Sequence, residues 1–372
     1  MKTIVFLLTA HSAEDERVRY HQLPSLVEAG WTAYIVAPSQ GELPGSNPYA
    51  RLYDAHTMTR RQCVNHCVEM LRELKPDVVL ADTPMALWMA VRYRRSSKRA
   101  VAVLYDVTEW YPSKKNLRFL TGIAKGLKFC AMVLFNAFVN LFTDGFVFGE
   151  VDKARPFRRL FPHRPFVMTS YYPDLKYITT FPAESLRQQV RLFYSGNLTD
   201  EKGFGNVLKA AVWVARFNPE TQVVLNLLSN QRLEKTPSLP ANLSLQIDEY
   251  QPFAEFCRRA AQNDVFLDLR IPDDENQKCL PIKLFYFMAM GRPVVYTDLK
   301  AIHKGCPEFE DFGSYVNPFD TQQIVDVVND YIRNAETYGK CCEAALRWAK
   351  EKYNWKSIEA DFVRFIQQYE QH

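Results

Sequence analysis

Residues 280–295, LPIKLFYFMAMGRPVV, predict a short helix that is followed at once by a strand. Pro281 suits the beginning of a helix, and Gly291 suits the left-handed residue just past its end. Lys283 falls in the first helical turn, where a cation lies near the positive end of the helix dipole and is mildly unfavourable unless an anion binds there. The stretch therefore predicts a helix and strand of an α/β fold, with an anion beside Lys283.

Strand-like apolar runs recur on both sides of this stretch, with helical segments between them. Such alternation indicates parallel sheets wrapped by helices. The fold class predicted is α/β, with two Rossmann-like parallel-sheet domains in tandem. The first half holds TIVFLLT (from 3), WTAYIVAP (31), DVVLAD (77), VAVLYDV (101) and DGFVFGE (144), and the second holds RLFYSGN (191), QVVLNLL (222), LSLQID (243), DVFLDLR (264) and PVVYTD (293).

The segment FVMTSYYPDLKYITTFPAESLRQQ (166–189) interrupts this rhythm with two prolines and paired tyrosines. We therefore expect an N-terminal domain over 1–170, a linker over 171–190 and a C-terminal domain over 191–353. Residues 354–372 should form a helix that packs back toward the N-terminal domain. Ligands of parallel sheets bind beyond the carboxyl ends of the strands, so two such domains facing each other would place a cleft between them.

The composition describes a globular chain whose charge is unevenly divided. Of its 372 residues, 47% are hydrophobic and 24% charged, which excludes a disordered chain. Residues 1–170 carry 23 Lys and Arg against 15 Asp and Glu, and the remainder carries 23 against 27. A basic first half and an acidic second half favour different partners for the two domains, although chance surface composition gives the same counts. We expect no nucleic-acid partner.

The cysteines and the N-terminus indicate a cytoplasmic protein without a metal site. Eight cysteines form no CxxC pair, so reduced thiols are expected. Cys63, His66 and Cys67 lie in an amphipathic helical pattern, which favours buried thiols over a zinc site. The apolar run that begins at Thr3 is too short for a signal peptide and is typical of a first strand.

Small and basic residues follow the first strand of the second half, in SGNLTDEKGFGNVLKAA (195–211). Gly196 and Asn197 follow the strand and Lys202 and Gly203 precede a helix, which is the pattern of an anion cradle at a helix N-terminus. Glycines there also serve as plain turn residues. Because Lys202 and Lys283 both follow strands of one sheet, together they could neutralise a diphosphate, which is the anion expected beside Lys283.

Two of these stretches resemble elements of retaining glycosyltransferases of family four, which have the GT-B fold and include enzymes of bacterial surface-polysaccharide synthesis. YSGNLTDEKGF (194–204) resembles the family's glycine-loop-lysine-glycine element, and LPIKLFYFMAMGRPVVYTD (280–298) resembles its PxK…EYMAxGxPVV element. Weaker matches are LYDVTEWYP (104–112), SYYPDL (170–175) and residues 11–38.

The resemblance implies transfer of a sugar from a nucleotide-diphosphate donor to a glycan or lipid-linked acceptor. The C-terminal domain would hold the donor and the N-terminal domain the acceptor, and no metal or other cofactor would be needed. The donor-binding positions that the resemblance implies are Gly196, Asn197, Lys202, Gly203, Pro281, Ile282, Lys283 and Tyr286.

The chain departs from the family pattern at four positions. The helix glutamate that binds the donor ribose falls at Tyr286, and the glutamate eight residues earlier falls at Lys278. Asn197 replaces a frequent arginine, and Thr108 replaces the histidine of the N-domain stretch. Either donor recognition is unusual or activity is weakened. Two alternatives therefore stay open: a non-catalytic GT-B binding partner, and a nucleotide-sugar epimerase of the same fold.

Three polar residues of the first half follow strand ends and are candidates for catalysis. Asp106 and Glu109 would contribute to acceptor binding or proton handling, and His11 is either a further residue of the same cleft or a plain loop residue. For the carboxylates, a helix N-cap and a solvated side chain are equally plausible roles.

Residues 117–142, LRFLTGIAKGLKFCAMVLFNAFVNLF, contain an uncharged, aromatic-rich run from Phe129 to Phe142. The run is shorter than the roughly twenty residues that cross a bilayer. A buried domain helix is the first expectation, and an interfacial helix on anionic lipid is the alternative, since five basic residues precede the run. With that alternative the protein would be peripheral at the inner face of the plasma membrane. The five are Lys114, Lys115, Arg118, Lys125 and Lys128.

Overall fold

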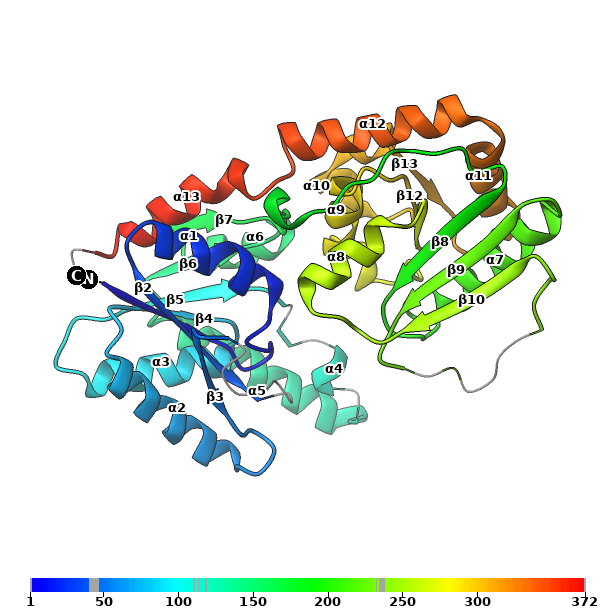
Figure 1. The fold of residues 1–372 in the computed structure, drawn as a ribbon. Helices are drawn as coiled ribbons and strands as arrows, with labels where there is room; N and C mark the ends of the chain where they lie inside the picture. The colour runs from blue at the N-terminus through cyan, green and yellow to red at the C-terminus, as the bar shows by residue number, and fades with distance from the viewer. Residues whose placement is uncertain are drawn as a thin grey trace. The chain divides into compact units, whose positions relative to one another are not determined.

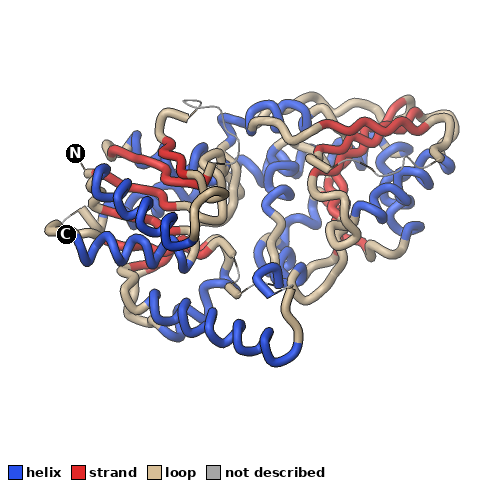
Figure 2. Tube along the Cα trace, turned by 90° about the horizontal axis from the view of Figure 1, so that it is seen from below, coloured by secondary structure: helices blue, strands red, loops and turns tan. Residues whose placement is uncertain are grey.

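The computed structural model divides the chain into two compact units. Unit 1 comprises Met1–Tyr171 and Ile358–His372, and unit 2 comprises Tyr172–Ser357. Each unit is one parallel sheet flanked by helices (Figure 1), and Figure 2 shows the strands of each unit lying between helical segments. The predicted pair of Rossmann-like α/β units is confirmed. The structure describes residues 2–39, 47–109, 111–112, 114–117, 119–231, 233 and 238–370.

Unit 1 is built on a seven-stranded parallel sheet in the order β3-β2-β1-β4-β5-β6-β7. The first strand pairs with two neighbours, Ile4 opposite both Ala33 and Val78, which places it at the centre of the sheet. The strands are β1 (Thr3–Leu7), β2 (Thr32–Pro38), β3 (Ala50–Tyr53), β4 (Val78–Ala81), β5 (Ala102–Val107), β6 (Gly145–Phe148) and β7 (Phe166–Met168).

Helices α2 and α3 lie on one face of this sheet, and α1 and α13 lie on the other (Figure 1). Hydrogen bonds join the C-terminal segment to the rest of unit 1: among them, Ser25 Oγ donates to Glu359 Oε1 of α13 at 2.6 Å, and Tyr369 OH, just past this helix, donates to the Asp144 carbonyl at 3.2 Å. The helices are α1 (Leu23–Glu28), α2 (Arg60–Leu74), α3 (Pro84–Ser96), α4 (Lys114–Leu117), α5 (Gly122–Asn140), α6 (Val151–Leu160) and α13 (Lys356–Gln367), with a π-helical turn at Val18–Gln22.

Unit 2 is built on a six-stranded parallel sheet in the order β10-β9-β8-β11-β12-β13. Helices α7 and α11 pack on one face and α8 and α9 on the other. The strands are β8 (Gln189–Ser195), β9 (Gln222–Leu228), β10 (Leu243–Asp248), β11 (Val265–Asp268), β12 (Val294–Thr297) and β13 (Gly313–Val316). The helices are α7 (Phe204–Phe217), α8 (Phe253–Ala261), α9 (Ile282–Ala289), α10 (Lys300–Gly305), α11 (Thr321–Arg333) and α12 (Ala335–Glu351), with 3₁₀ turns at Leu175–Tyr177, Asn276–Lys278 and Pro307–Asp311.

The stretch that predicts α9 and β12 forms the interior of unit 2. All residues from Leu284 to Ala289 are buried, as expected for a helix that is apolar on every side. The rings of Phe287 and Phe266 stack with centroids 4.0 Å apart. Gly291 follows the helix with φ +72, and a Cβ there would lie 2.7 Å from Leu346 Cγ, so its predicted left-handed role is confirmed. Pro281 is the N-cap residue, and the helix begins at Ile282.

The predicted interdomain segment belongs to unit 2 from Tyr172 onward. The Tyr172 ring contacts Phe285 at 5.0 Å and Tyr353 at 5.3 Å between centroids. The Trp355 amide donates to the Pro173 carbonyl at 2.8 Å. The segment that leaves unit 1 is therefore packed against the segment that returns to it.

The expectation that residues 117–142 form a buried helix is wrong. Helix α5 does form, but Ile123, Leu127 and Leu134 are 84%, 68% and 69% exposed. Only Val139 and Asn140 are buried within it. Among the described residues, α5 is the one helix whose length and apolar composition would suffice to cross a membrane. The physical reason is that the core of unit 1 packs against the C-terminal part of α5 and leaves residues 121–131 exposed.

Candidate functional site

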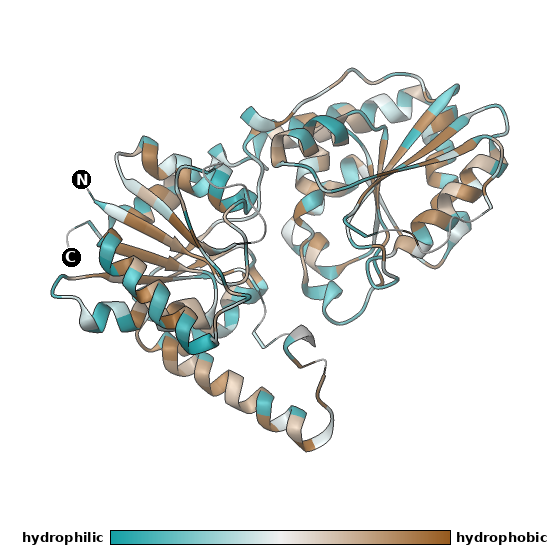
Figure 3. Ribbon diagram, turned by 60° about the horizontal axis from the view of Figure 1, so that its bottom comes forward, coloured by the Kyte–Doolittle hydropathy of each residue, from teal (hydrophilic) through white to brown (hydrophobic). Residues whose placement is uncertain are grey.

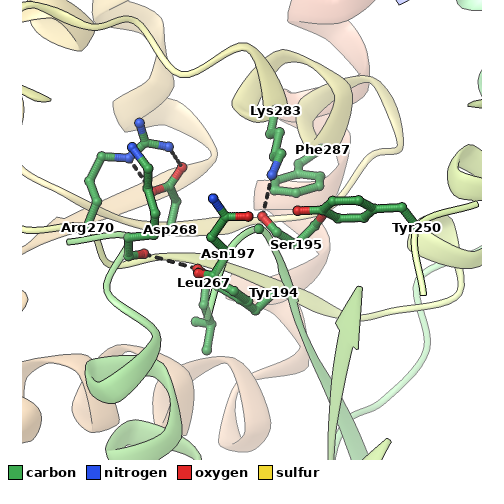
Figure 4. A pocket seen from close by; sticks show the side chains of 11 residues that line it. Tyr194, Ser195, Asn197, Tyr250, Leu267, Asp268, Arg270, Lys283 and Phe287 are labelled. Atoms are coloured by element: carbon green, nitrogen blue, oxygen red, sulfur yellow. Dashed lines mark hydrogen bonds and ion pairs between the residues drawn. The ribbon is translucent and has the colours of Figure 1, made fainter. Parts of the chain in front are cut away.

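A polar pocket of about 200 Å³ lies at the carboxyl ends of β8 and β11 in unit 2. Its position is the one at which parallel α/β sheets bind ligands. Figure 4 shows its side chains converging from the ends of the two strands, from the loop that precedes α8, and from α9. The pocket is lined by Tyr194, Ser195, Gly196, Asn197, Lys202, Tyr250, Leu267, Asp268, Arg270, Lys283 and Phe287.

Lys283 enters the pocket from the first turn of α9. Its Nζ donates a hydrogen bond to the Ser195 carbonyl at the end of β8 (Figure 4). The first turn of α9 contains no acidic residue. The ammonium group therefore adds to the positive end of the helix dipole, and this part of the pocket attracts an anion.

The loop from Gly196 to Gly203 is held close to the sheet. Tyr194 OH donates to the Asn197 carbonyl at 2.6 Å. Gly203 has φ +78, and a Cβ on it would lie 1.9 Å from the Leu269 carbonyl oxygen, so only glycine fits. A Cβ on Gly196 would approach Lys283 Nζ to 3.5 Å. The glycines thus bring the loop backbone against the end of β11 and against the lysine.

Two more cations complete the charge of the pocket. Lys202, whose side chain is 36% exposed, has its Nζ 3.1 Å from Glu201 Oε1 at the rim. Arg270 forms a bidentate pair with Asp268, with Nε–Oδ1 at 2.7 Å and Nη2–Oδ2 at 2.5 Å. Burial alone would lower the pKa of the Arg270 guanidinium, but the Asp268 carboxylate raises that pKa by more. Three cations and one carboxylate give the lining an excess of positive charge.

Aromatic side chains supply the remaining surface of the pocket. Tyr250 lies in the loop between β10 and α8, and burial raises the pKa of its hydroxyl, as it does for Tyr194. Both hydroxyls are therefore neutral hydrogen-bonding groups. Phe287 contributes an apolar ring from α9. The pocket can thus bind a group that combines phosphate with a flat or sugar-like portion.

Four of the eight donor-binding positions expected from the sequence line this one pocket: Gly196, Asn197, Lys202 and Lys283. Gly203 lies beside it as the N-cap of α7. Pro281 and Ile282 begin α9 but are not lining residues. Tyr286 is 3% exposed and packs against Phe253, with ring centroids 5.5 Å apart. Tyr286 therefore belongs to the apolar core of unit 2 and is not a lining residue of the pocket.

Sequence reasoning missed Arg270, Asp268 and Tyr250. The run DVFLDLR contains the signal for the first two, because Asp268 ends a buried strand of the same sheet and Arg270 lies two residues beyond it. No comparable signal marks Tyr250, since the loop after β10 has no distinctive pattern.

In unit 1, His11 is oriented by a buried carboxylate. His11 Nδ1 lies 3.0 Å from Asp82 Oδ2, and Asp82 also accepts hydrogen bonds from the Thr9 and Ala10 amides at 2.9 and 3.0 Å. Burial lowers the pKa of His11, but the hydrogen bond to Asp82 and the charge of Asp15 raise it by more, so the net pKa is above its ordinary value. His11 is a partly exposed, titratable group at the carboxyl end of the sheet.

The two other predicted catalytic residues lie in different surroundings. Asp106 is 3% exposed, and its Oδ2 accepts a hydrogen bond from Arg17 Nη1 at 2.8 Å. Burial raises the pKa of Asp106, while the Arg17 charge opposes that change. Glu109 is exposed, two residues beyond the end of β5. The structure therefore gives Asp106 a buried ion pair and leaves Glu109 on the surface.

No group of three or more metal-ligating side chains occurs within the described parts of the chain. All eight cysteines lie in the described parts of the chain, and none of them forms a disulfide bond. Burial raises the pKa of the Cys67 thiol to about 12, so it is a buried, protonated group.

No family model and no curated protein matches this chain. Solved structures do. Sucrose-phosphate synthase from Thermosynechococcus elongatus is 11% identical with a TM-score of 0.70, and the match covers 99% of each chain. HepE from Anabaena, in complex with UDP-glucose, is 13% identical with a TM-score of 0.68, covering 99% of this chain and all of HepE. The fold is GT-B.

The GT-B neighbours also include a protein of another class. A Listeria monocytogenes protein assigned as a UDP-N-acetylglucosamine 2-epimerase is 12% identical with a TM-score of 0.59, and the match covers 100% of this chain and 98% of that one. At these identities the likeness establishes the GT-B fold alone. The chemistry must be argued from the residues of the pocket.

Proposed function

We propose that this protein is a glycosyltransferase that binds a nucleotide-diphosphate sugar in the pocket of unit 2. The observation that carries the proposal is the convergence of Lys202, Arg270 and Lys283 at the carboxyl ends of two neighbouring strands. A diphosphate is the group that three cations, a helix N-terminus and a glycine-lined loop bind together. The UDP-glucose complex of the GT-B protein HepE supports a nucleotide-sugar donor.

The cations would act in the reaction as well as in binding. When the bond between the sugar and the diphosphate breaks, negative charge grows on the leaving phosphate oxygen. Fixed positive groups stabilise that charge more strongly in the transition state than in the ground state. Lys283 is suited to this task because its ammonium group is anchored by the Ser195 carbonyl. The same cations supply the countercharge that a divalent metal would give, so we propose metal-independent transfer.

The acceptor belongs, in this proposal, to unit 1. His11 is partly exposed and Asp82 fixes its ring, so it is the polar group best suited to meet an acceptor hydroxyl. Asp106 is less suited, because its carboxylate is buried against Arg17. We further propose a glycan or lipid-linked acceptor, surface-polysaccharide synthesis and retention of anomeric configuration, in keeping with the resemblance of residues 194–204 and 280–298 to retaining family-four enzymes.

A thermal-shift panel tests the donor site. Nucleoside diphosphates and their sugars should raise the melting temperature, whereas the parent nucleosides should not, because a ligand stabilises only the state that binds it. EDTA should leave the shift unchanged. If no nucleotide or nucleotide sugar changes the melting temperature at millimolar concentration, the proposed donor site does not exist.

Product analysis separates the proposal from its two rivals. A transferase releases nucleoside diphosphate, slowly when the sugar is transferred to water and faster when it is transferred to an acceptor. An epimerase converts the nucleotide sugar to its epimer without acceptor. This alternative is tested because the Listeria neighbour is assigned as an epimerase. A non-catalytic partner binds the nucleotide sugar and returns it unchanged. Chromatography of the nucleotide-sugar pool after incubation distinguishes the three outcomes.

A further inference from the structure

Helix α5 presents a continuous apolar stripe on its outer side. Its residues recur at spacings of three, four or seven, which places them on one side of an α-helix. In Figure 3 α5 is the long helix at the bottom of the view, brown and pale along most of its length with short teal bands. The exposed apolar residues of the stripe are Ile123, Leu127, Leu134, Phe138 and, at the C-cap, Leu141, whereas the exposed Phe129 and Val133 lie on another side of α5.

Unit 1 itself leaves the N-terminal part of this stripe uncovered. Phe135 and Phe142 pack against its core, and Phe138 contacts Trp88 of α3 with ring centroids 6.3 Å apart, so the C-terminal end of α5 is anchored. Residues 121–131 are exposed on every side of the helix. An exposed apolar surface of this extent marks an interaction site in a folded protein.

The charge around the stripe indicates the chemistry of the partner. Residues 110–143 contain five basic residues and no aspartate or glutamate. Lys125 and Lys128 lie about 200° and 140° around the helix axis from Ile123, since each residue advances the helix by about 100°. An apolar stripe with lysines on the other side is the pattern of a helix that lies in the interface of an anionic membrane. A second copy of the chain would bring a second basic segment against the first.

The sheet topology excludes a membrane-spanning helix. Although α5 has 19 residues, enough for about 28 Å of helix, it connects two strands that are hydrogen-bonded neighbours. Leu104 of β5 pairs with Gly145 of β6, and Val107 pairs with Phe148. A single crossing would place these paired strands on opposite sides of the bilayer. The segment must therefore enter and leave the membrane on the same side.

We propose that α5 inserts its apolar stripe into one leaflet of an anionic phospholipid bilayer and holds unit 1 at the membrane surface. The lysines of α5 would remain at headgroup level, where their long side chains reach the lipid phosphates. This proposal stands on unit 1 alone and is independent of the donor pocket. If the acceptor is lipid-linked, membrane binding through α5 would also bring unit 1 to the surface in which that acceptor lies.

Vesicle flotation of the full chain tests the proposal. The wild type should float with vesicles of equal parts phosphatidylglycerol and phosphatidylcholine at low salt, and much less with phosphatidylcholine alone. The triple variant Ile123→Ser, Leu127→Ser, Leu134→Ser should lose at least about tenfold in bound fraction, because the buried apolar area is removed. Leu160→Ser is the matched control, since Leu160 is 67% exposed on another helix of unit 1. A wild type that stays in the bottom fractions overturns the proposal.

A charge variant tests the electrostatic part. Lys125→Ala with Lys128→Ala should weaken flotation at low salt and make it less sensitive to salt, whereas Lys209→Ala with Lys350→Ala, two exposed lysines of unit 2, should behave as wild type. Equal loss in the two lysine pairs would contradict a specific role for α5.

Two further measurements separate insertion from self-association. Ile123→Trp should gain fluorescence that lipids brominated near the headgroup quench more strongly than lipids brominated at the acyl ends. Sedimentation without lipid should show a monomer. A dimer that the triple serine variant dissociates, in a protein that does not bind vesicles, would identify a second copy as the occupant and refute the membrane proposal.

Discussion

Lys283 lies in the first turn of α9, where the helix dipole disfavours a cation unless an anion is bound, and its Nζ donates to the Ser195 carbonyl. We expect Lys283→Ala to weaken binding of a nucleoside diphosphate by about tenfold to a hundredfold, the value of a charge-assisted hydrogen bond, and to leave binding of the nucleoside unchanged. Titration calorimetry measures both. Lys209→Ala is the control, because Lys209 is exposed outside the pocket. A proportional loss for nucleoside and diphosphate would place Lys283 outside the phosphate site.

Tyr286 illustrates how a residue can match a family position and still lie in the core. We expect Tyr286→Glu to reduce the free energy of unfolding by at least about 3 kcal/mol, because a carboxylate would be buried beside the Phe253 ring. Tyr286→Phe keeps the ring and should cost about 1 kcal/mol. Urea unfolding measures both variants. A stable glutamate variant with improved nucleotide affinity would instead show that Tyr286 takes the ribose position implied by the resemblance.

The loop between β8 and α7 shows how an element shapes the pocket through backbone rather than side chains. We expect Gly203→Ala to destabilise unit 2 by about 3 kcal/mol, because its positive φ is strained for alanine and its Cβ would meet the Leu269 carbonyl. Gly339→Ala is the control: nothing lies within 4 Å of its Cβ, and in helix α12 alanine should stabilise by about 1 kcal/mol. Thermal unfolding compares them. Equal melting temperatures would mean that the loop is not held against the end of β11.

At the level of elements, the sequence predicts every interior strand of the two sheets but only one of the four edge strands, β10. The ten apolar runs correspond to ten of the strands, because strands buried on both faces are nearly continuous in hydrophobic residues. The structure adds β3, β7 and β13, of four, three and four residues, at sheet edges. Edge strands have one pairing partner and partly exposed side chains, so their composition resembles that of loops.

The candidate site could be predicted in part for a similar reason. Lys202 and Lys283 follow recognisable strand and helix signals, so their meeting could be inferred from topology. The run DVFLDLR marks Arg270 as a residue near a strand end, but its place in the pocket depends on the pairing of β11 with β8. The exposure of α5 depends on which helices unit 1 can cover. Neither is a local property of the sequence.

For the whole molecule, the chain leaves unit 1, forms unit 2 and then returns, so its last segment completes the core of unit 1. Phe362, Phe365 and Ile366 of α13 are buried in unit 1, which lies at the other end of the sequence. We expect a chain ending at Ser357 to have a less stable unit 1, by several kcal/mol for three lost core side chains, with the melting transition of unit 2 retained. Calorimetry resolves the two transitions. A stable unit 1 in the shortened chain would contradict this assignment.

The return of α13 to unit 1 also affects the order in which the units can fold during synthesis. Domains generally fold as units while the chain emerges from the ribosome, with the N-terminal one first. Here every residue of unit 2, from Tyr172 to Ser357, is made before Ile358 begins the last segment of unit 1. The core of unit 2 can therefore be completed before that of unit 1. Until α13 is made, part of one sheet face of unit 1 stays uncovered. A nascent chain of this protein therefore exposes apolar surface until translation has passed unit 2, and that is the interval in which a ribosome-bound chaperone would find it.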